Sequence, residues 1–201
     1  MVDQPAAKKA SFRTVFEVGA AHLSQAQGIA EKFQEAIAPA TVNFDFGHIR
    51  AAADAIPDSA VVKMVRGWGL QETAPVHVMV MSLKEAVRQA LPVTVESPAF
   101  WSKVEGTLVD AFVGIAGREG EPGLSFYREE ADRTSYYRDL LFAFQDEDET
   151  GDDVYVIAFC VDVTVGLGKA ELAKLGVEDT AAFAIRLNAV VVRQGAVAVE
   201  A

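Results

Sequence analysis

Two long apolar segments on either side of an acidic turn constrain the fold of this chain more than any other feature of its sequence. Residues 135–145 and 154–165 are rich in aromatic and β-branched side chains, which favour strands. Each segment holds roughly ten to twelve residues, whereas a strand usually has about five or six. The turn between them, DEDETGDD at 146–153, is strongly polar. The pattern predicts a β-hairpin of unusually long strands.

A third segment of the same character, residues 182–193, follows the hairpin. At about 3.3 Å per residue, a strand of this length can cross the hydrocarbon core of a bilayer. The segment at 154–165 is also apolar at both alternating sets of positions as far as Cys160. A strand that is apolar on both faces has to be covered on both faces. The sequence therefore predicts a sheet that lies between two other layers.

The first half of the chain has the helical periodicity needed to supply those layers. Apolar residues recur at helical spacing in 21–37, and a short alanine-rich helix is expected to stop at Pro57. Two stronger helices are predicted at 75–91 and 98–115, the second with Ser97 as its N-cap. The apolar stripe of the first contains Val80, Leu83 and Val87, and that of the second contains Trp101, Val104, Leu108 and Phe112.

These elements together predict one domain, in which helix layers cover a sheet. No linker and no internal repeat divides the sequence. The domain is expected to span 12–195, between a flexible N-terminal tail at 1–11 and a C-terminal tail at 196–201. Shorter elements are predicted as strands at 12–18, 61–68 and 124–127 and as a charged helical turn at 168–176.

Composition excludes several classes of partner and site. The 201 residues carry a formal net charge of −11 at pH 7, which argues against nucleic acid and against attraction to anionic lipid headgroups. A single cysteine excludes an internal disulfide, and the three histidines are too widely spaced for a local metal motif. The start, MVDQPAAKKASF, lacks the apolar stretch of a Sec signal peptide, and no segment has the length and apolarity of a membrane-spanning helix. We therefore expect a protein that folds in water, without a metal or cofactor.

Candidate catalytic and metal-binding residues are few. The acidic turn at 146–153 resembles a calcium loop, but Ile157 stands where that pattern requires a glutamate, so a solvated hairpin tip is favoured. Cys160 lies among apolar residues, and we expect a packed thiol rather than a nucleophile. Asp45 and His48 could form a dyad, although a histidine that makes a backbone contact at a helix entry is favoured. The sequence thus predicts a protein that is not an enzyme.

Several of these segments together resemble the Cyt family of cytolytic delta-endotoxins, which are volvatoxin-like pore-forming toxins. The stretch TSYYRDLLFAFQDEDETGDDVYVIAFCVDVTV at 134–165 is similar to the paired long strands of that family, and FAIRLNAVVV at 183–192 is similar to its last core strand. GTLVDAFVGI at 106–115 resembles the helix before the strands, and NFDFGHIRAAADAI at 43–56 resembles a helix entry in the N-terminal half. The resemblance covers most of the chain.

The resemblance implies a three-layer α/β domain in which amphipathic helical hairpins wrap a mostly antiparallel sheet. It also implies a toxin that is released in soluble form, binds membrane lipids directly, forms a homo-oligomer on target-cell membranes and needs no catalysis. In this hypothesis the hairpin at 75–115 leaves the sheet, and strands from several copies insert into the bilayer or lie on it. The strand residues expected to meet the membrane are Tyr136, Leu140, Phe142, Phe144, Val156, Phe159, Val161, Val163, Phe183, Ile185, Leu187 and Val191.

Two other classes of function remain open from the sequence. The same apolar strands would suit a non-lytic module that holds a lipid or acyl chain between a helix layer and the sheet. An enzyme with a site assembled from scattered residues, such as Asp45 and His48, is the third class. Release of dye from neutral liposomes distinguishes a toxin from a carrier, because a carrier leaves the vesicles intact.

Overall fold

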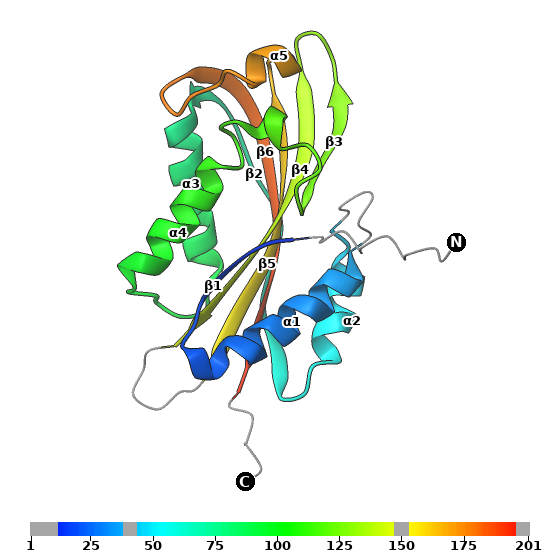
Figure 1. Cartoon of the computed structure of the whole chain (residues 1–201), viewed down its shortest axis with the longest axis vertical. Coiled ribbons are helices and arrows are strands. Elements are labelled where there is room, and N and C mark those ends of the chain that lie inside the picture. The colour runs from blue at the N-terminus through cyan, green and yellow to red at the C-terminus, as the bar shows by residue number, and fades with distance from the viewer. Residues whose placement is uncertain (1–11, 38–43, 147–152, 196–201) are drawn as a thin grey trace, which may run out of the picture.

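Three long strands form the centre of the molecule (Figure 1). They are β4 (Thr134–Gln145), β5 (Val154–Val165) and β6 (Thr180–Gln194), and they pair antiparallel in that order. The computed structural model describes residues 12–37, 44–146 and 153–195, and these residues form one sheet of six strands with helices on both faces. The predicted fold class, a single α/β domain with a mostly antiparallel sheet, is confirmed. The predicted tails lie outside the described residues.

The predicted hairpin is present, and its two strands pair along their whole length without a register shift. The backbone amide of Asp146 donates a hydrogen bond of 3.2 Å to the carbonyl of Asp153, beyond the last strand pair. The tip at 147–152 lies outside the described residues, so the calcium-like part of the turn stays a sequence-based interpretation.

The outer edges of the sheet differ from each other. β1 (Arg13–Glu17) runs parallel to the second half of β4, and β3 (Leu124–Glu129) runs antiparallel to its first half. On the opposite side of the sheet, β2 (Ser59–Pro75) pairs with β6. β2 is much longer than the predicted strand at 61–68, because Gly67, with a φ of 63°, lies at a register shift that bends the strand without ending it.

One face of the sheet is covered by α3 (Val76–Ala90) and α4 (Pro98–Val109). The hydroxyl of Ser97 caps α4 as predicted and accepts a hydrogen bond of 3.2 Å from the backbone amide of Phe100. α4 ends before the predicted position 115. The chain turns after it, with Gly114 in the left-handed region at a φ of 68°, and continues in a 3₁₀ segment, η2 (Ile115–Arg118).

The other face of the sheet is covered by α1 (Leu23–Ala36) and α2 (Phe46–Asp54), and the 3₁₀ segment η1 (Ala20–His22) leads into α1. Figure 1 shows that α1 and α2 lie beside one half of the long strands, away from the end of the sheet that carries β3 and the short α5 (Lys169–Leu172). This partial cover is the main departure from a complete three-layer sandwich.

Hydrophobic cores lie on both faces. The larger core joins α3 and α4 to alternating residues along almost the whole length of the long strands, from Phe144 to Tyr136 on β4. The smaller core joins α1 and α2 to residues such as Leu141 and Val190. The expected burial of 154–165 on both faces therefore holds as far as Cys160, whereas Asp162 and Thr164 are only partly buried.

Candidate functional site

The interface between the α3–α4 hairpin and the sheet contains nearly all residues that the sequence singled out. The seven predicted hairpin residues are buried in the larger core, although Phe112 lies in the turn after α4. Eleven of the twelve predicted strand residues belong to the same core, and Val156 faces α1 and α2 instead. A role for these residues in membrane binding stays a prediction. Their shared location identifies one helix-covered apolar sheet face.

Aromatic side chains fill the centre of this interface. Phe100 of α4 contacts Phe142 and Phe144 of β4, with ring centroids 6.3 and 5.2 Å apart. Near the other end, the rings of Phe112 and Phe183 meet edge to face at 5.6 Å. Such pairs contribute about 0.5–1.5 kcal/mol beyond the burial of their area. Apolar packing is therefore the main force that holds the hairpin on the sheet.

Polar contacts determine how the hairpin is held together and anchored. The ammonium of Lys84 on α3 lies 2.6 Å from the carboxylate of Glu105 on α4 and joins the two helices. Lys103 of α4 forms an ion pair with Glu17 of β1. The buried hydroxyl of Tyr136 donates a hydrogen bond of 2.7 Å to the carbonyl of Ala111. The helices are thus linked to each other and, at separate points, to the sheet.

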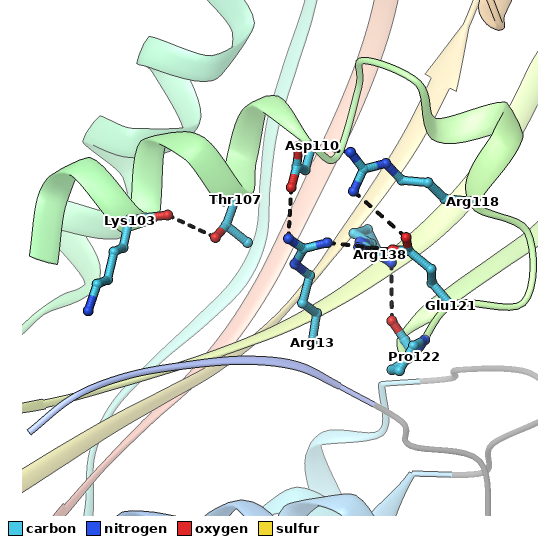
Figure 2. Close-up of polar contacts among 8 residues, drawn as sticks. All are labelled: Arg13, Lys103, Thr107, Asp110, Arg118, Glu121, Pro122 and Arg138. Atoms are coloured by element: carbon cyan, nitrogen blue, oxygen red, sulfur yellow. Dashed lines mark hydrogen bonds and ion pairs between the residues drawn. The ribbon is translucent and has the colours of Figure 1, made fainter.

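A cluster of charged residues lies where the turn after α4 meets β1 and β4 (Figure 2). We call this group the Arg138 cluster. Asp110 accepts from Arg13 at 2.8 Å and from Arg118 at 3.0 Å, and Glu121 lies 3.0 Å from the guanidinium of Arg138. The cluster therefore connects an edge strand, the central sheet and the segment that follows the hairpin.

Arg138 is the member of the cluster that most needs hydrogen-bond partners, because its charged side chain is 0% exposed. It donates hydrogen bonds to Glu121 and to the carbonyl of Pro122, at 3.1 Å, while its Nε has no partner among the described residues. Burial lowers the pKa of Arg138, and the carboxylate of Glu121 opposes that shift. Removal of Glu121 would leave a buried charge with little compensation.

The sequence did not identify this cluster. Its one signal was Arg138 itself, which alternates with Tyr136 and Leu140 on the face that packs against the helices. A buried cation requires an anionic partner, but nothing in the spacing of the acidic residues indicated Glu121.

A second unusual pair, Asp139 and Cys160, lies on the opposite face of the sheet. The two residues are direct partners in the β4–β5 ladder and are 0% and 4% exposed. Neither carboxylate oxygen of Asp139 has a normal hydrogen-bond partner within the described ranges, and the facing thiol is only a weak donor. Burial raises the pKa of both groups, and the carboxylate of Asp139 raises the pKa of Cys160 further. The expected burial of Cys160 is confirmed.

Asp45 and His48, which the sequence offered as a possible catalytic dyad, have a structural role at the start of α2. The carboxylate of Asp45 accepts a hydrogen bond of 2.9 Å from the backbone amide of His48 and caps α2. This bond lowers the pKa of Asp45. The described ranges contain no group of three or more acidic, histidine or cysteine side chains placed to hold a metal. None of the helices in those ranges is long and apolar enough to cross a membrane.

A hollow of about 850 Å³ lies at the end of the hairpin interface. It is bordered by the loop between α3 and α4, by the residues that follow β1 and by Phe100 and Phe144. Glu17 and Glu96 give it an acidic lining. There the helix layer and the sheet leave room for another molecule.

Comparisons with known proteins agree with this architecture. The family model described as Bacillus thuringiensis toxin matches residues 1–200. The type-2Aa cytolytic delta-endotoxin of Bacillus thuringiensis subsp. kyushuensis is 32% identical over 190 residues, which are 94% of this chain and 73% of that protein. The type-2Ba toxin of subsp. israelensis is 27% identical over 190 residues, with 94% and 72% covered.

Solved structures give the same result. A delta-endotoxin structure has a TM-score of 0.88 at 29% identity and covers 100% of this chain and 88% of its own. The activated Cyt2Ba monomer from Bacillus thuringiensis subsp. israelensis has a TM-score of 0.87 at 27% identity, with 94% of this chain and 100% of that chain covered.

Proposed function

This chain belongs to the Bacillus thuringiensis toxin family, and we propose that it is a cytolytic toxin that permeabilises membranes by direct contact with lipid. The similar proteins are cytolytic delta-endotoxins by name. The observation that carries the proposal is the amphipathic α3–α4 hairpin, which covers an apolar face formed by three strands of twelve to fifteen residues. Movement of one helical unit would expose that face.

The strands are the proposed membrane-active part. Backbone groups in a bilayer must be hydrogen-bonded internally, which only helices and closed strand assemblies achieve. Three strands of one copy cannot close into such an assembly. The proposal therefore includes a homo-oligomer on the membrane, in which the strand face that α3 and α4 cover in solution meets lipid.

The polar contacts determine what must break for the hairpin to leave. Lys84 and Glu105 hold α3 and α4 together, so the two helices move as one unit. The Lys103–Glu17 pair and the Tyr136–Ala111 hydrogen bond connect that unit to the sheet and have to open. Arg138 then has to reach water or a polar part of the oligomer, because a charge at the bilayer centre is costly. The mechanism uses no bond-making step, catalytic group or cofactor.

A crosslink between the hairpin and the sheet tests this mechanism. Lys103→Cys and Glu17→Cys replace two polar residues that already meet, and a short thiol-reactive crosslinker whose link can be reduced joins them in a Cys160→Ala background. We expect the crosslinked protein to release little dye from phosphatidylcholine vesicles and the reduced protein to regain full release. Each single-cysteine variant, treated with the same reagent, is the control. Undiminished release by the crosslinked protein would show that α4 need not leave β1.

The hollow at the end of the hairpin favours one alternative. A non-lytic carrier would place an acyl chain beside Phe100 and Phe144, where the hollow reaches the interface between helices and sheet. Such a carrier would extract fluorescent fatty acid from vesicles without releasing their contents. Dye release at a constant lipid composition therefore decides between the two functions.

A further inference from the structure

Among the residues that the structure describes, no helix lies over one half of the sheet face that carries α1 and α2 (Figure 1). The burial of β6 differs between the two halves. Its residues alternate between exposed and buried from Thr180 to Leu187, whereas Ala189 to Val192 are all buried. The uncovered residues form two rows across the sheet. They are Tyr137, Asp162, Arg186 and Gly69 in the first row and Ser135, Thr164, Ala184 and Gln71 in the second, and we call them together the open face. All of them are at least partly exposed except Ser135, which is 1% exposed.

The open face is hollowed along β2, β5 and β6. Two shallow hollows of about 490 and 580 Å³ share Gln71, Thr164 and Ala184, so they form one continuous trough. Small residues make up much of its lining, which allows a ligand to approach the backbone closely. These small residues are Gly67, Gly69, Gly166, Ala182 and Ala184.

An aromatic side chain stands beside this trough in a fixed orientation. The ring of Tyr127 stacks on that of Tyr137, with centroids 4.5 Å apart and planes 25° apart. Its hydroxyl donates a hydrogen bond of 2.7 Å to the carboxylate of Asp162. Tyr127 is nevertheless 46% exposed, so part of an immobilised ring remains open to solvent.

The polar groups of the open face are also held in place, and one strong donor is unused. Ser135 and Thr164 share a hydrogen bond of 2.8 Å. Arg186 lies directly opposite Asp162 in the ladder, yet within the described residues it forms no ion pair with that carboxylate or any other. A guanidinium and a carboxylate of opposite charge thus stand side by side without neutralising each other through contact.

We propose that the open face binds a neutral hexopyranose unit of a glycan. A sugar ring presents C–H groups on one face, which the negative face of an aromatic ring attracts, and neighbouring hydroxyls around its rim. Such hydroxyls can donate to Asp162 and accept from Arg186 at the same time. The opposite charges of these two residues favour a ligand without net charge, and the small lining residues leave room for its ring.

Other ligands fit the open face less well. A nucleic acid is disfavoured by the chain charge of −11 and by the carboxylate of Asp162. An acyl chain would bury the charges of Asp162 and Arg186 and would offer neither of them a hydrogen bond, at a cost in free energy. Binding of a glycan does not depend on membrane lysis, so this inference goes beyond the proposed function and can fail separately from it.

Titration of the intact chain with methyl β-D-galactopyranoside and methyl α-D-mannopyranoside, followed by NMR, tests the proposal. We expect saturable shifts confined to the open face and to Tyr127, around Asp162. Arg186→Gln and Asp162→Asn should each weaken binding by about tenfold, the usual effect of losing one charged hydrogen bond. Met81→Ala, an exposed change on α3 at the opposite face, should have no effect. The absence of saturable shifts with both sugars, or equal binding by all variants, would overturn the proposal.

A second measurement identifies the source of the sugar. Phosphatidylcholine vesicles with and without lactosylceramide are compared for recruitment of the wild-type protein and of Arg186→Gln. Recruitment that requires both lactosylceramide and Arg186 assigns the site to a glycolipid headgroup. Binding of the free glycoside without such recruitment assigns it to the glycan of a protein. If lactosylceramide recruits Arg186→Gln as well as wild type, the open face is not the glycan site.

Discussion

The two halves of one sheet face differ more than the two faces of the sheet do. Under α1 and α2 the face presents Leu141, Ala158 and Val190, all fully buried. A few residues farther along the same strands it presents Tyr137 and Asp162, which are partly exposed, and Arg186, which is exposed. The face below α3 and α4 remains apolar along almost the whole of the same strands. A long strand such as β5 or β6 can therefore be buried on both faces at one end and on one face only at the other.

This difference separates the roles of the two faces. The continuous apolar face is suited to lipid after the hairpin leaves, because its only buried charge is Arg138 among the described residues. The open face already contacts water and has polar groups that a bilayer would not accept. Substitutions on the two faces should therefore have very different effects on stability and on lysis.

The largest effect is expected for Phe142→Ala on the apolar face. Phe142 is fully buried and contacts the rings of Phe100 and Phe159. Its truncation should lower the free energy of unfolding by about 3–5 kcal/mol, measured by urea denaturation, and should change the rate of dye release. The matched control is Tyr137→Ala on the open face, where a much smaller loss is expected. Equal losses at the two positions would contradict the comparison.

A smaller effect is expected when Arg138 loses its carboxylate partner. Glu121→Ala leaves the buried guanidinium without its ion pair, and we expect a loss of about 2 kcal/mol because Glu121 is partly exposed. Thermal and urea unfolding measure the change. The double variant Glu121→Ala with Arg138→Met should recover most of the loss, since an apolar residue suits the site. If the double variant stays as unstable as Glu121→Ala, the remaining members of the Arg138 cluster require the charge of Arg138.

Asp139 should make the stability of the fold depend on pH. Burial raises its pKa in the folded state above the ordinary value, so its contribution is fully present below about pH 4 and is lost as the pH rises toward the folded pKa. Within that window the stability of the wild type should fall relative to Asp139→Asn by about 1.4 kcal/mol per pH unit. The groups that act on Asp139 are Arg138 beside it and Cys160 opposite.

The difference between wild type and Asp139→Asn, measured by urea unfolding at a series of pH values, isolates this group from other carboxylates. Cys160→Ala is the companion variant. Because burial and Asp139 raise the pKa of the thiol, its contribution should be lost above about pH 9. Parallel pH profiles for wild type and Asp139→Asn would show that the buried carboxyl has the same pKa in both states.

The smallest effect is expected for Tyr127→Phe on the open face. The change removes the hydrogen bond to Asp162 and keeps the stack on Tyr137. Because the bond is exposed, its loss should cost about 1 kcal/mol or less, measured by urea denaturation. The change also removes a hydroxyl whose pKa is raised to about 12 by burial and by the hydrogen bond to Asp162. A loss as large as that of Phe142→Ala would mean that the open face supports the core.

Much of the candidate site was predictable because its residues follow regular periods. The stripe of Val80, Leu83 and Val87 and the alternation on β4 identified the two surfaces that pack together. The exact ends of α4 and β2 were not predictable, since Gly114 ends one regular pattern and Gly67 interrupts another without ending the strand. The Arg138 cluster was also not predictable, because Arg13 of β1 and Arg138 of β4 are separated in the sequence from the segment that holds Asp110 and Glu121.

The long strands, the amphipathic helices and the resemblance to a toxin family could be read from the sequence, because strand and helix periods and local residue preferences act over a few neighbouring residues. Which parts of the sheet the helices cover became evident from the fold alone. α1 and α2 pack on Leu141 and Val190, whereas Asp162 is partly exposed and Arg186 is exposed, and this follows from helix length and chain path, which no local pattern encodes. For the same reason, the surroundings of Arg186, Asp139 and Tyr127 could not be predicted, because each of these residues meets its neighbours only when distant strands pair.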